Sequence, residues 1–246
     1  VATDYGAAGP GGTTLTVIDV AARKVARTIT FGTHVRPHGA AFLPDHRTLV
    51  VTAERGGALV LVDVVAGTIV REEPTGQMVA NITPGTLSIV DLAGDTPPAV
   101  VKVGTQTEAI AASPDGKMVW MGSNNTGKVF VVDVAKRDVI DSVQTSRFPY
   151  RIGFTPDSRT AIVNNPMSNE IWIFDAQTRA VKAKIAVVDP DGGNAAPFGL
   201  IVSPKGGKAW ITMNGVAKVA ELDIATATLT RWMATGAGPD GIGLVP

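Results

Sequence analysis

An apolar segment that ends in aspartate recurs along the chain at nearly regular intervals. Its six copies are LTVIDV (Asp19), LVLVDV (Asp63), LSIVDL (Asp91), VFVVDV (Asp133), IWIFDA (Asp175) and VAELDI (Asp223). Successive aspartates are 44, 28, 42, 42 and 48 residues apart. A period near 42 residues with four strand-like segments per repeat is typical of β-propellers, in which each repeat forms one blade. The repeat therefore predicts an all-β fold.

One complete repeat, residues 149–187, divides into four strand-like segments joined by short connections. Its segments are PYRIGFTP, TAIVNN, EIWIFD and AVKAKIAV, in that order. The turn after the first segment has Pro at its second position and Asp at its third, which suits a type I turn, and SPDG at 113–116 is its clearest copy. The aspartate that closes the third segment can accept hydrogen bonds from backbone N–H groups of the next turn. We therefore interpret all six copies as structural.

The two ends of the sequence predict how the sheets close on themselves. Residues 238–246 (GPDGIGLVP) look like a first strand without a second, and residues 1–6 (VATDYG) look like a second strand without a first. The 23 residues after Asp223 and the first 19 residues together amount to 42, which is one repeat. We therefore predict a single β-propeller domain over residues 1–246, with six blades of four-stranded antiparallel sheet closed by the N- and C-terminal strands. Seven blades are the alternative, which needs one further repeat.

The shortest interval, from Asp63 to Asp91, departs from the repeat. After PTGQ (74–77) the sequence passes directly to MVANITPG, so a first strand, its turn and half of a second strand are missing. By the repeat length, about 14 residues are apparently absent between Gln77 and Met78. We favour such an absence over a truncated blade, because removing an innermost strand leaves a hole beside the propeller axis.

The composition limits the partners and the chemistry. The 22 Lys and Arg residues balance the 22 Asp and Glu residues, so no net charge favours nucleic acid or an acidic membrane surface as a partner. No apolar run approaches the roughly 18 residues of a membrane-spanning helix, so membrane insertion is not expected. The absence of cysteine excludes disulfides, thiolate metal sites and the C-x-x-C-H attachment of c-type haem.

Three segments resemble the YVTN-type β-propeller repeats, which include those of the YncE-like periplasmic proteins. The segments are SPDG (113–116), VANITPGTLSIVDL (79–92) and GKVFVVDVAKRDVI (127–140). The resemblance covers nearly the whole chain and implies a propeller. Because members are often exported bacterial proteins with binding roles, it also implies a periplasmic or otherwise exported location. Similar repeats occur in domains that carry d1-type haem and in some sugar-lactone hydrolases. The chain begins at Val1 and shows no signal peptide, so we expect a mature or trimmed form.

The connections between strands predict where a ligand binds. In a propeller, the loops between second and third strands share a face with the crossings between blades, and here these connections vary most. The first strands enter from this face at Pro37, Thr107, Pro149, Pro197 and Pro239. We predict that ligand-binding residues lie at or beside these entries: His34, Arg36, His38, Glu108, Tyr150, Arg151, Phe198 and Asp240.

Other polar residues fall on the same predicted face. Six asparagines lie where the loops between second and third strands begin: Asn81, Asn124, Asn125, Asn164, Asn165 and Asn214. We interpret them mainly as turn residues, and any that point inward could donate to a polar ligand. The segment DPDGGN (189–194) looks like a calcium loop but lacks the spacing of its ligands. No metal site and no cofactor are therefore predicted.

Three functions fit these features. We favour a non-catalytic binding or scaffold propeller that presents its mouth to a small polar ligand or a protein partner. The first alternative is a lactone hydrolase with a metal or acid–base site, in which His38, Glu108, Arg151 and Asp240 supply acid–base and charge-stabilising groups. The second alternative is a protein that associates with haem or a quinone through His34 or His38. No complete catalytic motif such as G-x-S-x-G is present, which favours the binding function.

Overall fold

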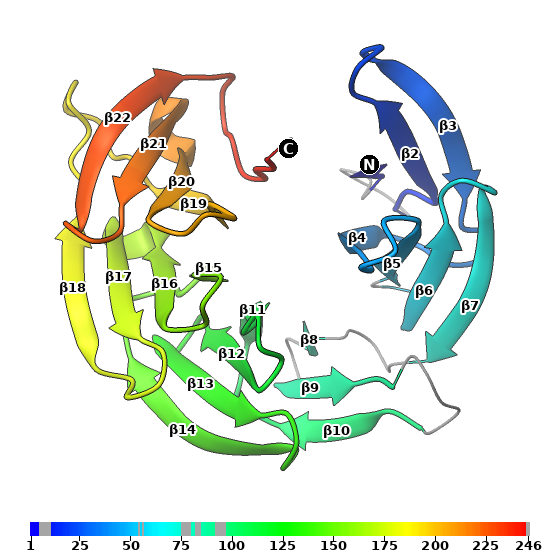
Figure 1. The fold of residues 1–246 in the computed structure, drawn as a ribbon, viewed down its shortest axis with the longest axis horizontal. Helices are drawn as coiled ribbons and strands as arrows, with labels where there is room; N and C mark the ends of the chain where they lie inside the picture. The colour runs from blue at the N-terminus through cyan, green and yellow to red at the C-terminus, as the bar shows by residue number, and fades with distance from the viewer. Residues whose placement is uncertain are drawn as a thin grey trace. The chain divides into compact units, whose positions relative to one another are not determined.

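Antiparallel β-sheet makes up almost all of the regular structure (Figure 1). The computed structural model describes residues 1–4, 11–53, 55, 57–74, 80–81, 85–91 and 97–244. Within each sheet, every strand pairs with its neighbour in the chain. The chain divides into two compact units: unit 1 is Val1–Asn81 with Leu87–Val100, and unit 2 is Ile82–Thr86 with Val101–Pro246.

Unit 2 contains three complete four-stranded sheets in chain order. The first consists of β11 (Thr107–Ala112), β12 (Met118–Ser123), β13 (Lys128–Asp133) and β14 (Asp138–Gln144). The second consists of β15 (Arg151–Phe154), β16 (Thr160–Asn165), β17 (Glu170–Asp175) and β18 (Val181–Ala186). The third consists of β19 (Pro197–Val202), β20 (Lys208–Met213), β21 (Lys218–Asp223) and β22 (Thr228–Ala234). The 3₁₀ helices η1 (Pro166–Ser168) and η2 (Asn214–Val216) connect second to third strands in the last two sheets.

Unit 1 contains one four-stranded and one three-stranded sheet. The larger consists of β4 (Pro37–Phe42), β5 (Thr48–Ala53), β6 (Ala58–Asp63) and β7 (Thr68–Pro74). The smaller consists of β1 (Ala2–Thr3), β2 (Thr14–Asp19) and β3 (Lys24–Thr30). A further short sheet is formed by β8 (Ala80–Asn81), β9 (Thr86–Ile89) and β10 (Ala99–Lys102).

The blade count differs from the sequence-based prediction. The four four-stranded sheets and the sheet β1-β2-β3 each contain at least two strands of six or seven residues, and they form five blades. The sheet β10-β9-β8 has strands of only two and four residues, because just 28 residues separate Asp63 from Asp91. The prediction of six four-stranded blades, with seven as the alternative, is therefore wrong. The described residues form an all-β propeller fold with five blades, of which four have four strands.

The predicted pairing of the N- and C-terminal strands is also wrong for the described residues. The sheet that contains β1 consists of β1, β2 and β3 alone, and residues 235–244 form no strand. This segment contains four glycines and Pro239, which weaken a strand through backbone entropy and the loss of an N–H donor. Gln77, Met78 and the terminal Pro246 lie outside the described residues. The predicted gap between Gln77 and Met78 therefore stays untested, as does any pairing of Pro246.

The aspartate that ends the next-to-last strand of a blade fixes the turn that follows it. Each of five such side chains accepts a hydrogen bond of 2.8 or 2.9 Å from the backbone N–H three residues ahead: Asp19, Asp63, Asp133, Asp175 and Asp223. The structural interpretation of these five residues is thereby confirmed. Asp63 also accepts two hydrogen bonds from the guanidinium of Arg47, which together with the turn N–H groups hold its pKa at about 2.

Buried aromatic side chains join successive blades of unit 2. Trp120 on β12 is fully buried, and its ring meets Phe154 and Phe174 of the next sheet edge-on, at centroid distances of 5.7 and 5.8 Å. This packing brings the first strands β11, β15 and β19 side by side within the unit (Figure 1). The ends of these three strands therefore present their residues to a common region.

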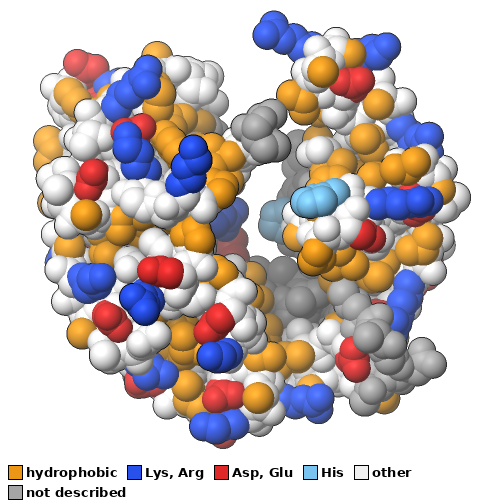
Figure 2. Space-filling model, viewed as in Figure 1, with side chains coloured by type: hydrophobic (Ala, Val, Ile, Leu, Met, Phe, Trp, Pro, Cys, Tyr) orange, Lys and Arg blue, Asp and Glu red, His pale blue; other side chains and the backbone are white. Residues whose placement is uncertain are grey.

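Charged side chains of both signs are interspersed over the surface in view in Figure 2, in keeping with the equal numbers of basic and acidic residues. The described part of the chain contains no helix with the length and apolarity needed to span a bilayer.

Candidate functional site

The first strand of a blade begins with a recurring backbone feature. The residue before the entry Pro or Thr has a φ between 48° and 65° at Arg36, Gln106, Phe148, Ala196 and Gly238. The pairing register with the second strand then shifts at Pro37/Ala40, Thr107/Ala109 and Pro197/Leu200. Such bulges take residues out of the ladder, redirect their side chains and are common beside active sites. The residues presented in this way include His38, Glu108 and Phe198, while Tyr150 immediately precedes β15.

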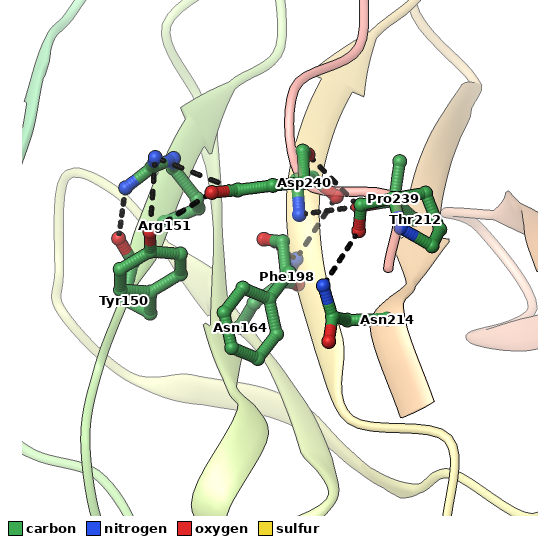
Figure 3. A network of polar contacts seen from close by, with 9 residues as sticks. Tyr150, Arg151, Asn164, Phe198, Thr212, Asn214, Pro239 and Asp240 are labelled. Carbon is green, nitrogen blue, oxygen red and sulfur yellow. Dashed lines mark hydrogen bonds and ion pairs between the residues drawn. The ribbon is translucent and has the colours of Figure 1, made fainter. Parts of the chain in front are cut away.

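In unit 2, Tyr150, Arg151 and Asp240 form a connected polar network (Figure 3). The Tyr150 hydroxyl donates to Asp240 Oδ2 at 3.3 Å, and Arg151 Nη2 donates to the Tyr150 hydroxyl at 3.3 Å. Arg151 Nη1 also donates to the Tyr150 carbonyl at 3.1 Å, and Nη2 lies 3.7 Å from Asp240 Oδ1. Packing of the sheets, rather than proximity in the chain, brings Asp240 to these residues, because it lies 90 positions after Tyr150.

The Tyr150 ring is the centre of an aromatic group. Phe148 stacks on it with a centroid distance of 5.6 Å, and Phe198 meets it at 4.8 Å with a tilt of 58°. The guanidinium carbon of Arg151 lies 4.1 Å from the ring centroid, within the range of cation–π attraction. The side chains of Arg151 and Asp240 remain 35% and 46% exposed, so a solvent-borne ligand can reach both.

Burial raises the pKa of Tyr150 above its ordinary value, so its phenol is protonated at neutral pH and donates to Asp240. The Arg151 charge lowers this pKa, whereas the charges of Asp240 and Glu108 raise it further. Glu108 lies at the start of β11, which is in contact with β15. Its carboxylate is fixed by Asn124, whose Nδ2 donates to Glu108 Oε2 at 2.6 Å.

Side chains of the last blade hold the segment 238–240, which is not a strand. Thr212 Oγ1 donates to the Asp240 carbonyl at 3.0 Å, and Asn214 Nδ2 donates to the Pro239 carbonyl at 3.2 Å (Figure 3). A Cβ atom on Gly199 would lie 1.8 Å from the Asp240 carbonyl oxygen, so only glycine permits this approach. Asp240 therefore occupies the position of an entry residue without the strand that was predicted to follow.

Arg151 and Asn164 depart from their counterparts in the other blades. Two residues after the entry positions the chain has Gly39, Ala109, Arg151, Gly199 and Gly241. On the second strands, Gly122 and Asn164 lie opposite Ala109 and Arg151, and Thr52 and Thr212 lie at the register shifts beside Gly39 and Gly199. The two threonines accept hydrogen bonds from the N–H groups of Gly39 and Gly199, at 2.9 and 2.6 Å. Among the described blades, an arginine and an asparagine replace these small residues only in β15–β18.

Three buried acceptor oxygens of this region have no hydrogen-bond donor among the described residues: Asn124 Oδ1, Asn164 Oδ1 and Asp240 Oδ1. The amide of Asn164 cannot turn over without loss, because its Nδ2 donates to the Phe198 carbonyl at 3.1 Å. A buried acceptor without a donor costs stability, so a ligand that donates hydrogen bonds would gain most here. We call the following eight residues the Tyr150 site: Glu108, Asn124, Phe148, Tyr150, Arg151, Asn164, Phe198 and Asp240.

The Tyr150 site includes five of the eight residues that the sequence predicted: Glu108, Tyr150, Arg151, Phe198 and Asp240. The other three, His34, Arg36 and His38, lie in unit 1. His34 Nε2 is 3.0 Å from Glu72 Oε2, and the His38 carbonyl accepts a hydrogen bond from Thr3 at 3.0 Å. The ligand-binding role of all eight residues stays a prediction.

Sequence reasoning missed Phe148, Gly199 and Thr212, and it treated Asn164 mainly as a turn residue. Comparing the blades position by position gives the missing signal for Asn164, because it replaces a threonine or glycine exactly where Arg151 replaces a glycine or alanine. No sequence pattern marks Gly199, whose role depends on the approach of the Asp240 carbonyl.

The described residues do not form a metal site. No three His, Asp or Glu side chains among them group closely enough to hold an ion. In the segment DPDGGN, Lys218 Nζ lies 2.6 Å from both Asp189 Oδ1 and Asp191 Oδ2. This ammonium takes the place of a bound cation, and its hydrogen bond lowers the pKa of Asp189.

Comparison with known proteins assigns the fold to a family. A family model described as "SMP-30/Gluconolactonase/LRE-like region" matches residues 18–237. The chain is similar to hydrazine synthase of Kuenenia stuttgartiensis, with 17% identity, a TM-score of 0.81, and 94% of this chain and 83% of that one covered. It is also similar to the β-propeller domain of Cps50 (Swd1) from Myceliophteria thermophila, with 16% identity, a TM-score of 0.67, and 89% and 79% covered.

At these identities, the two solved structures show the β-propeller fold and nothing about activity. No curated protein sequence matches the chain significantly. The matches do not specifically show the YVTN-type affiliation. Because the family model spans most of the sequence, the chain belongs to the SMP-30/gluconolactonase/LRE-like family of β-propellers.

Proposed function

We propose that this chain is a binding propeller whose Tyr150 site holds a small polyhydroxylated ligand. The observation that carries the proposal is the joint departure of Arg151 and Asn164 from the repeat. Gly199 and Thr212 meet the needs of the scaffold at the same places in the next blade. The larger charged and amide side chains therefore exceed what the fold requires, and such residues on a rigid scaffold are candidates for binding.

Each part of the Tyr150 site suits one part of such a ligand. The partly exposed rings of Tyr150 and Phe198 offer an apolar surface for the C–H face of a sugar-like ring. Asn124 Oδ1 and Asp240 Oδ1, which accept no hydrogen bond from the described residues, can accept hydrogen bonds from hydroxyl groups. A few polar groups beside an aromatic surface are the usual composition of a small-molecule site.

Saturation-transfer NMR with glucose, glucitol and gluconate tests the proposal on the full chain. We expect signals from at least one probe, and an affinity about tenfold lower after Arg151→Gln, because a hydrogen bond to a charged group contributes roughly 1.5–3 kcal/mol. Arg179→Gln is the matched control, since Arg179 pairs with Asp141 at 3.4 Å outside the site. Absence of binding by all three probes, or an equal loss in the control, would contradict the proposal.

A second candidate function, hydrolysis of a lactone, is favoured by the family to which the chain belongs. In that case Glu108 or Asp240 would activate a water molecule, and Arg151 would stabilise the negative oxygen that forms on the carbonyl. The described residues do not group to hold a metal, so no step through a metal is derived.

Hydrolysis of glucono-δ-lactone, followed by acid release above the spontaneous rate, separates the two functions. A hydrolase would lose roughly a hundredfold or more in rate after Asp240→Asn or Glu108→Gln. A binding propeller would show no rate above the spontaneous one in the wild type. An exported location and a YVTN-type affiliation belong to the same proposal, and the sequence resemblance alone supports them.

A further inference from the structure

Hydrogen-bond donors and acceptors are used unequally at the Tyr150 site. Each of the following side chains already donates at least one hydrogen bond within the protein: Asn124, Tyr150, Arg151, Asn164, Thr212 and Asn214. The acceptors are in excess, because Asn124 Oδ1, Asn164 Oδ1 and Asp240 Oδ1 are buried without a donor among the described residues. The site therefore gains hydrogen bonds chiefly from a ligand that donates them.

The charges of the Tyr150 site are also unequal. Arg151 lies 3.7 Å from Asp240, so these two charges offset each other. Glu108 receives its hydrogen bond from the neutral amide of Asn124 and forms no ion pair with the described residues. With Glu108 and Asp240 each carrying −1 and Arg151 carrying +1, the site has one negative charge in excess, and Glu108 lies at the start of β11, the strand in contact with β15.

We propose that the ligand of the Tyr150 site carries a protonated amine that binds beside Glu108. This inference rests on the proposed function, because it names the chemistry of the ligand of the same site. An ammonium group has three donors and no acceptor, which complements an acceptor-rich site. The neighbouring ring of Phe198 also attracts a cation, whereas the Tyr150 ring already has the Arg151 guanidinium against it. A carboxylate would bring further acceptors and a repelling charge.

Calorimetric titration of the full chain with three related sugars tests the inference. Glucosamine and glucuronate each differ from glucose at one carbon, the first by an amine and the second by a carboxylate. At about pH 6 the amine is protonated. We expect glucosamine to bind about two- to fivefold more tightly than glucose, and glucuronate to bind more weakly by a similar factor, as for a partly exposed charge pair.

The variant Glu108→Gln tests whether Glu108 causes the preference for glucosamine over glucose. It removes the negative charge and keeps an acceptor for the Asn124 amide. We expect the ratio of glucosamine to glucose affinity to fall to about one in this variant. Glu221→Gln is the matched control, since Glu221 pairs with Lys208 at 2.6 Å outside the site, and it should keep the wild-type ratio.

The outcomes distinguish this inference from the proposed function. If glucose binds but glucosamine binds no more tightly, or if Glu108→Gln keeps the preference, the inference is overturned and the proposed function stands. If CaCl₂ binds the wild type and glucosamine shows no preference, the excess acceptors serve a metal and the inference is overturned. If none of the three sugars binds, the inference is overturned, and the proposed function is overturned as well if glucitol and gluconate also fail to bind.

Discussion

The blades β15–β18 and β19–β22 share one scaffold and differ where their first strands begin. In β19–β22, the Thr212 hydroxyl accepts from the Gly199 N–H at 2.6 Å and donates to the Asp240 carbonyl at 3.0 Å. In β15–β18, the corresponding Asn164 donates to the Phe198 carbonyl at 3.1 Å and keeps an unpaired oxygen. In both blades a side chain of the second strand donates a hydrogen bond to the backbone carbonyl of the next entry residue. Only β15–β18 has further polar groups that this hydrogen bond does not require. The difference separates the requirements of the fold from those of the proposed binding.

Of the changes that test this comparison, replacing Gly199 of blade β19–β22 should have the largest effect on stability. We expect Gly199→Ala to lower the free energy of unfolding by about 1–3 kcal/mol, because the new Cβ meets backbone and overpacks the contact. That atom would lie 1.8 Å from the Asp240 carbonyl oxygen and 2.8 Å from Thr212 Oγ1. Urea unfolding followed by circular dichroism measures the change.

The equivalent glycine of blade β4–β7 is the control for this prediction. A Cβ atom on Gly39 would meet only Thr52, whose Oγ1 lies at 3.3 Å. Gly39→Ala should therefore cost less than about 1 kcal/mol. Equal losses in the two variants would show that the Asp240 contact does not decide the outcome.

Exchanging the pattern of one blade for that of its neighbour should have the next largest effect. The double variant Arg151→Gly with Asn164→Thr copies β19–β22 into β15–β18. We expect a small loss of stability, about 1 kcal/mol from the added glycine, and about a tenfold loss of affinity for any sugar that the wild type binds. Calorimetry and urea unfolding on the same samples measure both quantities. A large loss of stability with unchanged affinity would show that these residues serve the fold.

The sequence alone was sufficient to predict those features of the two blades that depend on the repeat. Counting from the turns located the entry residues Glu108, Tyr150, Phe198 and Asp240, because turn chemistry fixes the strand boundaries. It could not show that Gly199 admits the Asp240 carbonyl, since that contact depends on packing between residues far apart in the chain. The predicted pairing of the N- and C-terminal strands was wrong for a related reason. The pattern of residues 238–246 predicts a strand, but glycines, Pro239 and the side chains that hold the segment replace sheet pairing.

The residues before the entry positions have a positive φ, and this allows a smaller test. It compares Ala196, before β19, with Gly238, in the segment after β22. Gly238 has a φ of 61° and no close neighbour, so Gly238→Ala is opposed by backbone conformation alone. We expect it to lower the free energy of unfolding by about 1 kcal/mol. Ala196, with a φ of 48°, already bears this cost, so Ala196→Gly should be neutral or slightly stabilising. A loss in Ala196→Gly as large as that in Gly238→Ala would contradict the argument.

The protonation of Tyr150 provides the smallest and most local test of what sets blade β15–β18 apart. The chain has two tyrosines, Tyr5 and Tyr150, so Tyr5→Phe leaves Tyr150 as the only phenol whose absorbance changes with pH. Its folded-state pKa is raised, chiefly by burial, so its contribution to stability is full below about pH 10 and is lost as the pH rises through the folded pKa.

We expect the absorbance midpoint to lie above the ordinary value for tyrosine, to fall after Asp240→Asn and to rise after Arg151→Gln, because these charges act on the phenol in opposite directions. Asp141→Asn is the control, since Asp141 has the same 46% exposure as Asp240 and also pairs with an arginine. It should leave the midpoint unchanged. If Asp240→Asn behaves like this control, the carboxylate does not act on Tyr150, and the network that distinguishes β15–β18 from its neighbour does not exist in solution.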